Sequence, residues 1–342
     1  MKKRERFRIT EYLGYLLVTI AVTLLCVCVG SVEIPVKDTV AVIVDAIFGT
    51  GVPEGVSVPI ILSVRLPRVL CVALVGASLS LCGAAMQGLL RNPLADGSTL
   101  GVSSGASLGA VLSLAFGIAI PGLPFAGTLG MAMLFAFLSL TLILTLTYAL
   151  DQSLSTNSII LIGVIFSMFA SSMISLVIAF AGEKVKSITF WTMGSLAGSN
   201  YAHVLLLLTA LAVCGGVILR FAQELNAFSL GEDNARCVGV DVKTVKLLIL
   251  IAVSVLIGVC VSVGGTIGFV GLVLPHIARR IVGANHKRLL PAAMFFGAVF
   301  LMLADLAART LFRPIELPIG VVTSLIGAVV FVMILYKTRG GR

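Results

Sequence analysis

The chain has 342 residues, of which 59% are hydrophobic, a mean hydropathy of +1.14 and a formal net charge of +9. A soluble domain is about 45–50% apolar, so this composition, arranged in long apolar runs, excludes a soluble globular protein and indicates several membrane crossings. The runs are continuous rather than alternating, which favours helices over barrel strands. An excess of lysine and arginine normally orients a membrane protein, so we attribute the charge to orientation and expect membrane lipid, and not nucleic acid, among the partners.

Ten apolar segments are predicted to cross the membrane, and together they make residues 1–342 a single transmembrane domain. In chain order they lie near residues 13–30, 67–90, 100–120, 126–150, 157–181, 203–222, 247–265, 268–283, 289–308 and 317–336. Nine are long enough for a hydrocarbon core of about 30 Å. The eighth is short and is interrupted by Pro275 and by two arginines.

The distribution of positive charge decides whether the eighth segment crosses. With ten crossings and a cytoplasmic start at MKKRERFRIT, which no cleavage site follows, seven of the 24 lysines and arginines lie outside: Lys37, Arg65, Arg68, Lys184, Lys186, Arg309 and Arg313. The other 17 lie on the cytoplasmic side. Without the eighth crossing the basic run RRIVGANHKR would fall outside and this bias would be lost. We therefore predict ten spans with both termini cytoplasmic.

Two segments on the outer side are long. Residues 31–64 contain PVKDTVAVIVDAIFG, which predicts an amphipathic surface helix. Residues 182–202 carry the single tryptophan, Trp191. It is either an interfacial anchor or part of a transport path, and the sequence leaves both open.

Glycines recur at helical spacing. Gly101, Gly105 and Gly109 are four residues apart, and a second group lies in GGTIGFVG, residues 264–271. Small residues at this spacing let helices approach closely in lipid. They also allow a helix to break where it lines a path.

Ionisable side chains within the spans are few. Asp305 is followed four residues later by Arg309, which predicts an ion pair within one helix. An ion-coupled carrier would need carboxylates near the membrane centre, and an intramembrane metalloprotease would need a His-Glu-x-x-His motif. Neither is present, and no Walker loop is present for ATP. The chain is therefore expected to be a non-catalytic transporter without a metal site or cofactor of its own, driven by a partner.

The polar segment, residues 230–246, differs from the chain around it. Six of its 17 residues are charged, and apolar spans precede and follow it. LGEDNARCVG predicts a short helix with acidic residues in its first turn, where the helix dipole favours them. Its charge assigns it to the cytoplasmic side, as a protruding knob or as a solvated connector.

These residues resemble the FecCD-type family, the permease subunits of type II ABC importers for iron–siderophore complexes, haem or cobalamin. The similarity covers nearly the whole chain. It is carried by RLPRVLCVALVGASLSLCGAAMQGLLRNPLADGSTLGVSSGASLG (65–109), LGEDNARCVGV (230–240), GFVGLVLPHIARRIVG (268–283) and ELPIGVVTSLIGAVVF (316–331). Two departures are minor: Val238 stands before Gly239, where the family has a bulkier residue, and Val329 replaces a common proline.

The resemblance implies roles for individual residues. Those that match the segment that docks in the ATP-binding subunit are Leu230, Gly231, Glu232, Ala235 and Gly239. Those that match outward-facing arginines, which pair with glutamates of a substrate-binding protein, are Arg65, Arg68 and Arg309; simple interfacial anchoring is the alternative. Those that match an inner gate are Asn92, Leu94, Thr156 and Asn157, although such polar groups could equally be helix caps.

The implied function is import of an iron chelate, a siderophore complex or haem, across the cytoplasmic membrane. In this interpretation the path lies between two copies of the chain, two ABC subunits bind ATP and Mg²⁺, and an extracytoplasmic binding protein delivers the substrate. A cobalamin permease is the first alternative, and an ion-coupled secondary transporter is the second.

Overall fold

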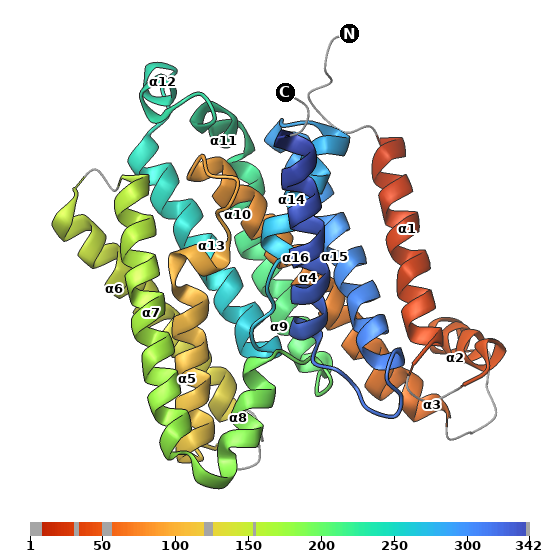
Figure 1. Ribbon diagram of the computed structural model, residues 1–342. Helices are drawn as coiled ribbons and strands as arrows, with labels where there is room; N and C mark the ends of the chain where they lie inside the picture. The colour runs from red at the N-terminus through yellow and green to blue at the C-terminus, as the bar shows by residue number, and fades with distance from the viewer. Residues whose placement is uncertain (1–8, 31–33, 50–56, 120–125, 153–154, 340–342) are drawn as a thin grey trace.

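The computed structural model describes residues 9–30, 34–49, 57–119, 126–152 and 155–339, and every regular element in these ranges is helical (Figure 1). In chain order the elements are α1 (Ile9–Cys28), α2 (Val36–Phe48), α3 (Ser57–Pro59), η1 (Ile60–Arg65), α4 (Leu66–Leu89), η2 (Gly97–Leu100), α5 (Val102–Phe116), α6 (Ala126–Leu150), α7 (Thr156–Phe180), η3 (Gly182–Lys184), α8 (Val185–Thr192), α9 (Tyr201–Ala210), η4 (Leu211–Gly215), α10 (Gly216–Arg220), α11 (Ala222–Phe228), α12 (Glu232–Cys237), α13 (Val242–Gly264), α14 (Val270–Val282), α15 (His286–Thr310) and α16 (Ile319–Arg339).

Each of the ten predicted crossings coincides with helix, the sixth as the continuous run α9–η4–α10. Within the described residues, seven of these helices are long and apolar enough to cross a membrane. Nine were expected to be long enough, and the number of ten crossings stays a prediction. α5 has only 15 residues, about 22 Å at 1.5 Å per residue, whereas α16 has 21. α5 is bounded by Gly101 and Gly117, whose φ angles of 75° and 66° stop the helix at both ends.

The bundle has two distinct ends. α11, α12, the first turn of α1 and the last turn of α16 lie together at one end, and α2, α3 and α8 lie at the other (Figure 1). We call these the α12 end and the α2 end. The predicted surface helix in residues 31–64 is present as α2, which buries Thr39 and Val42. Residues 31–33 and 50–56 of that segment lie outside the described residues.

α4 is the central helix. In an 18-residue apolar stretch of the span Ile60–Leu89, which contains α4, 78% is buried. In the corresponding stretch of α1 the share is 11%. Glycines permit this burial: Gly76 of α4 lies against Gly297 of α15, and Gly83 lies against Gly271 of α14, so closely that a methyl group on either α4 glycine would overlap the opposite carbonyl. Van der Waals contact of this kind drives helix association in lipid, where no hydrophobic effect operates between helices.

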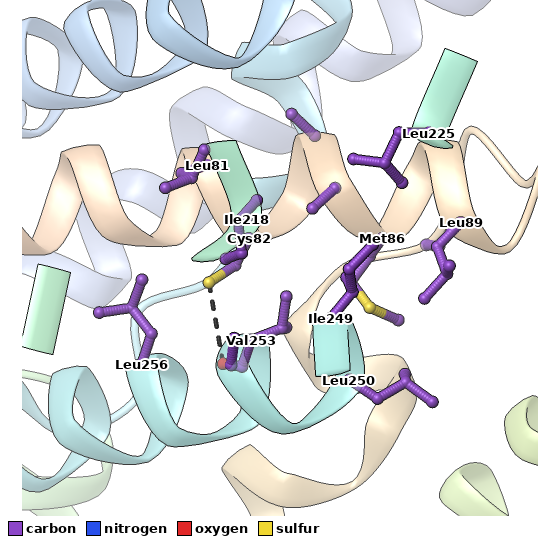
Figure 2. Close-up of a cluster of buried hydrophobic side chains, with 14 of the residues drawn as sticks. Leu81, Cys82, Met86, Leu89, Ile218, Leu225, Ile249, Leu250, Val253 and Leu256 are labelled. Atoms are coloured by element: carbon purple, nitrogen blue, oxygen red, sulfur yellow. Dashed lines mark hydrogen bonds between the residues drawn. The ribbon is translucent and has the colours of Figure 1, made fainter. Parts of the chain in front are cut away.

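One face of α4 joins the sixth span to α13. Figure 2 shows the side chains that meet there: Leu81, Cys82, Met86 and Leu89 of α4, Ile218 of α10, Leu225 of α11, and Ile249, Leu250, Val253 and Leu256 of α13. All are buried. The cluster packs the sixth span and α13 against α4, and the polar segment connects these two spans.

Candidate functional site

The polar segment forms a knob at the α12 end. Gly231 and Gly239 flank α12 with φ angles of 117° and 85°, which only glycine adopts readily. Ala235 is fully buried, whereas Leu230 and Val238 are each 70% exposed. The knob closes on itself, because the Val240 amide donates to the Ala235 carbonyl at 3.0 Å. Its outer surface therefore presents two large apolar side chains at the end of a membrane protein, as a docking contact requires.

The segment then leads directly into α13. The Asp241 side chain caps that helix, accepting a hydrogen bond from the Thr244 amide at 3.2 Å. Hydrogen bonds from Thr244 hold the pKa of the Asp241 carboxyl below its ordinary value. The cap joins the knob to the membrane-spanning helix without a flexible linker.

Glu232 faces inward rather than outward. Its Oε1 lies 2.7 Å from Nζ of Lys246, whose side chain is 1% exposed. The same oxygen accepts a long hydrogen bond, 3.4 Å, from the Thr156 hydroxyl at the start of α7. Of the residues matched to the docking segment, Leu230 is thus exposed, Ala235 is buried and Glu232 is bound within the chain.

The predicted gate residues lie in the turn that follows α4 and in the first turn of α7. Asn92 makes a tight turn, in which its Oδ1 accepts from the Leu94 amide at 2.9 Å, and Leu94 is 51% exposed. Thr156 begins α7, and Asn157 beside it is exposed. Ser155, not one of these four, caps α7 by accepting from the Ser158 amide. The joint action of the four residues as a gate stays a prediction.

Leu94 borders a partly open hollow of about 460 Å³ between α4, α5, α13 and α14. The break between α13 and α14, residues 265–269, forms one wall. Gly265 and Phe269 both have positive φ there. The prediction that the second glycine group allows a helix to break along a path therefore fits this wall. Trp191 is partly buried, and its carbonyl packs against Gly265.

The three arginines assigned to docking lie at the α2 end, but they are buried. Arg65, Arg68 and Arg309 are 5%, 7% and 2% exposed. Arg68 Nη2 contacts Asp305 Oδ1 at 2.9 Å and its Nη1 contacts Glu316 at 2.8 Å. Arg309 Nε lies 2.9 Å from Asp305 Oδ2, which confirms the predicted pair four residues apart.

Arg65 and Arg309 also donate hydrogen bonds to carbonyls at the C-terminal end of α1. Arg65 Nη1 donates to the Val27 and Cys28 carbonyls at 3.0 and 3.1 Å, and Arg309 Nη2 donates to the Cys26 carbonyl at 3.1 Å. The last carbonyls of a helix lack partners within it and favour positive charge. The expectation that these arginines face outward is therefore not met. Docking through them would compete with internal bonds, and it stays a prediction.

Sequence reasoning did not single out Lys246 or Glu316. Their partners are 14 and 248 positions away along the chain, and no helical or strand spacing connects such residues. Among the described residues, no group of three histidines, cysteines or acids is arranged to hold a metal ion.

The architecture and the knob point to a transporter, and comparison with known proteins assigns the family. Residues 17–337 match the model of the FecCD transport family. The chain belongs to that family. It is 42% identical to the uncharacterized ABC transporter permease protein YvrB of Bacillus subtilis, over 99% of this chain and 98% of YvrB. Its resemblance to FecCD-type permeases, seen in the motifs, is therefore confirmed, and the chain is a multi-pass protein of the cytoplasmic membrane.

Other FecCD relatives carry names for different substrates. The molybdate import permease MolB of Haemophilus influenzae is 39% identical over 82% of both chains. A "probable iron chelatin transport system permease protein" of Helicobacter pylori is 39% identical over 82% of this chain and 83% of its own. Further relatives are named as vitamin B12 import permeases. A solved "inward-facing conformation" of a "metal-chelate type ABC transporter" superimposes with a TM-score of 0.84 at 33% identity, covering 96% of this chain and all of that one.

Proposed function

We propose that two copies of this FecCD permease form the membrane part of an ATP-driven importer for an iron chelate, a siderophore complex or haem. Each copy crosses the membrane ten times with both termini in the cytoplasm. Two ATP-binding subunits hold ATP and Mg²⁺ on the cytoplasmic side, and a binding protein delivers substrate from outside. The path runs between the copies, and the chain itself performs no covalent chemistry.

The observation that carries the proposal is the α12 knob. Leu230 and Val238 are exposed at the α12 end, beside Arg236 of α12 and Lys243 at the start of α13, two of the cations predicted to be cytoplasmic. An apolar pair that flanks the short helix α12 offers an ATPase subunit a compact contact. The hollow bordered by Leu94 opens at the surface of the single chain, which suits a path completed by a second copy.

The lining of the hollow supports a bulky chelate as substrate. It is mostly apolar, with hydroxyls from Ser103, Ser104 and Thr266, one carboxylate from Asp96, and no lysine or arginine among its lining residues. A bare oxyanion such as molybdate is usually held by charge-assisted donors. A large ligand that carries its own coordination shell needs only a weakly binding surface. The iron chelatin relative and the metal-chelate type transporter support the same choice.

Reconstitution in lipid vesicles with the cognate ATPase and binding protein tests this proposal. Uptake of ferric siderophore or haem that requires ATP is the expected result. If cobalamin or molybdate were the sole compound transported, the proposal of an ATP-driven importer would stand, but its substrate would be that compound and not an iron chelate. Uptake driven by an ion gradient without the ATPase would support the secondary-transporter alternative instead.

The docking contact has its own test. Leu230→Glu combined with Val238→Glu should abolish co-purification of the ATPase, because two carboxylates would be buried in an apolar contact. Asp233→Asn, in α12 between these two residues, is the matched control, since the Asp233 side chain is 97% exposed and its ion pair with Arg236, at 3.6 Å, lies at the surface. Equal ATPase binding by both variants would place the contact elsewhere.

A further inference from the structure

The buried partner of Glu232 is the starting point. Lysine is almost never fully buried unless it is paired, and Lys246 is completely buried with its ammonium 2.7 Å from the Glu232 carboxylate. Breaking a buried ion pair is strongly destabilising, so each side chain restrains the other. The position of Glu232, and with it the first turn of α12, is therefore tightly specified by α13.

The same carboxylate reaches a third element. Thr156 donates to Glu232 Oε1 at 3.4 Å, and Thr156 begins α7 next to the exposed Asn157. That turn of α7 is itself held, because Asp151 Oδ2 accepts from the Ser155 amide and the Ser158 hydroxyl, both at 3.1 Å. One carboxylate thus connects the knob to the beginnings of two membrane-spanning helices.

The two faces of the knob have different chemistry. The outward side chains, Leu230 and Val238, are apolar and exposed, whereas Ala235 and the Glu232 carboxylate face the bundle. A displacement of α12 by a bound partner would therefore act on α13 and α7 through Glu232, while the contact with that partner would be made by the apolar pair.

We propose that Glu232 and Lys246 form a positioning pair that transmits movement of α12 to α7 and α13, and that Glu232 does not bind the ATPase. This inference rests on the proposed function, since it assigns the internal linkage of the same docking site. It separates two tasks within one short segment: attachment by Leu230 and Val238, and transmission by Glu232 and Lys246.

The test compares Glu232→Gln with Asp233→Asn in the assembled complex. The affinity for the ATPase and the amount of substrate imported per ATP hydrolysed are measured separately. For Glu232→Gln we expect ATPase affinity within about twofold of the parent and roughly tenfold less import per ATP, a coupling change of ordinary size for communicating sites. Asp233→Asn should change neither quantity.

Two further variants distinguish transmission from simple loss of folding. The exchange Glu232→Lys with Lys246→Glu keeps the pair and should restore at least half of the lost import per ATP. Amide hydrogen exchange should show that Glu232→Gln loosens the first turn of α7 as well as α12, a readout that needs no transport. Protection at α7 equal to the parent's would contradict the linkage even if import falls.

The remaining outcomes are also decisive. Glu232→Gln that weakens ATPase binding tenfold, yet imports normally per ATP once assembled, would make Glu232 a direct contact and overturn the proposal. Absence of ATP-dependent uptake by the unaltered complex would instead refute the proposed function, and in that case hydrogen exchange at α7 still reports whether the linkage exists.

Discussion

At the scale of single residues, the buried charges of the α2 end are the clearest case of structure that spacing alone cannot reveal. The pair between Asp305 and Arg309 follows from their separation of four positions on one helix. The contact of Arg68 with the same carboxylate joins residues 237 positions apart. Resemblance to the family suggested that these arginines face a partner protein. The fold instead brings α1, α4 and α15 together, and the guanidinium groups of the arginines contact carbonyls of α1 and the Asp305 carboxylate.

Asp305→Asn tests this arrangement. The substitution leaves Arg68 and Arg309 buried with their shared counter-charge removed, so we expect a loss of about 3–5 kcal/mol in the free energy of unfolding. Glu316→Gln is the control, because Glu316 is 31% exposed and its removal should cost about 1 kcal/mol or less. Denaturation in detergent, followed by tryptophan fluorescence, measures both. Equal effects would mean that Asp305 does not hold the cluster together.

Gly231 offers a second prediction for a single residue. At φ 117° and ψ 151°, a side chain is strained by about 1–3 kcal/mol. Gly231→Ala should therefore loosen α12 and raise the hydrogen-exchange rate of its amides. Gly216→Ala, in helical backbone with no atom within 4 Å of the added methyl group, should be neutral or slightly stabilising. Unchanged exchange at α12 in Gly231→Ala would show that the backbone there relaxes freely.

At the scale of elements, hydropathy located the helices well and their ends less well. The predicted span 126–150 coincides with α6, and 157–181 differs from α7 by one residue at each end, because long uninterrupted apolar runs define these helices. α5 was expected over 100–120 but has 15 residues, since the glycine geometry at its ends overrides the apolar run. The π-helical turns η1 and η4 have no sequence signal that we recognised.

The spacing of Gly105 and Gly109 correctly indicated close helix contact. A methyl group on Gly105 would overlap the Ser139 side chain, and one on Gly109 would overlap the Met131 carbonyl of α6. Gly109→Ala should therefore separate α5 from α6 and cost about 1–3 kcal/mol, seen as a lower midpoint of thermal unfolding. Gly130→Ala on α6 has no atom within 4 Å and should leave that midpoint unchanged. The interpretation fails if both variants behave alike.

At the scale of the whole molecule, the distribution of positive charge and the position of the knob both favour an orientation with the α12 end in the cytoplasm. α12 carries Arg236, and the ends of the elements that adjoin it or share this end of the bundle carry Arg220, Lys243, Lys287 and Arg288. Positive charge retained on the cytoplasmic side would place α12 where an ATPase operates. The sequence could predict this orientation because the bias depends only on where lysine and arginine lie between the apolar runs. It could not supply the inward turn of Glu232, which depends on how α12 meets α13.

A native cysteine allows this orientation to be measured. All seven cysteines lie in the described residues; Cys237 in α12 is exposed, Cys28 at the end of α1 is partly exposed, and the other five are buried. A membrane-impermeant maleimide should therefore label Cys237 in inside-out vesicles and not in right-side-out vesicles. Cys237→Ser should abolish that labelling, whereas any label on Cys28 should appear only from the opposite side. Bound ATPase should also protect Cys237, because the thiol lies next to Val238 on the docking surface. Labelling of Cys237 from the outer side would reverse the orientation and, with it, place the knob beyond the reach of a cytoplasmic ATPase.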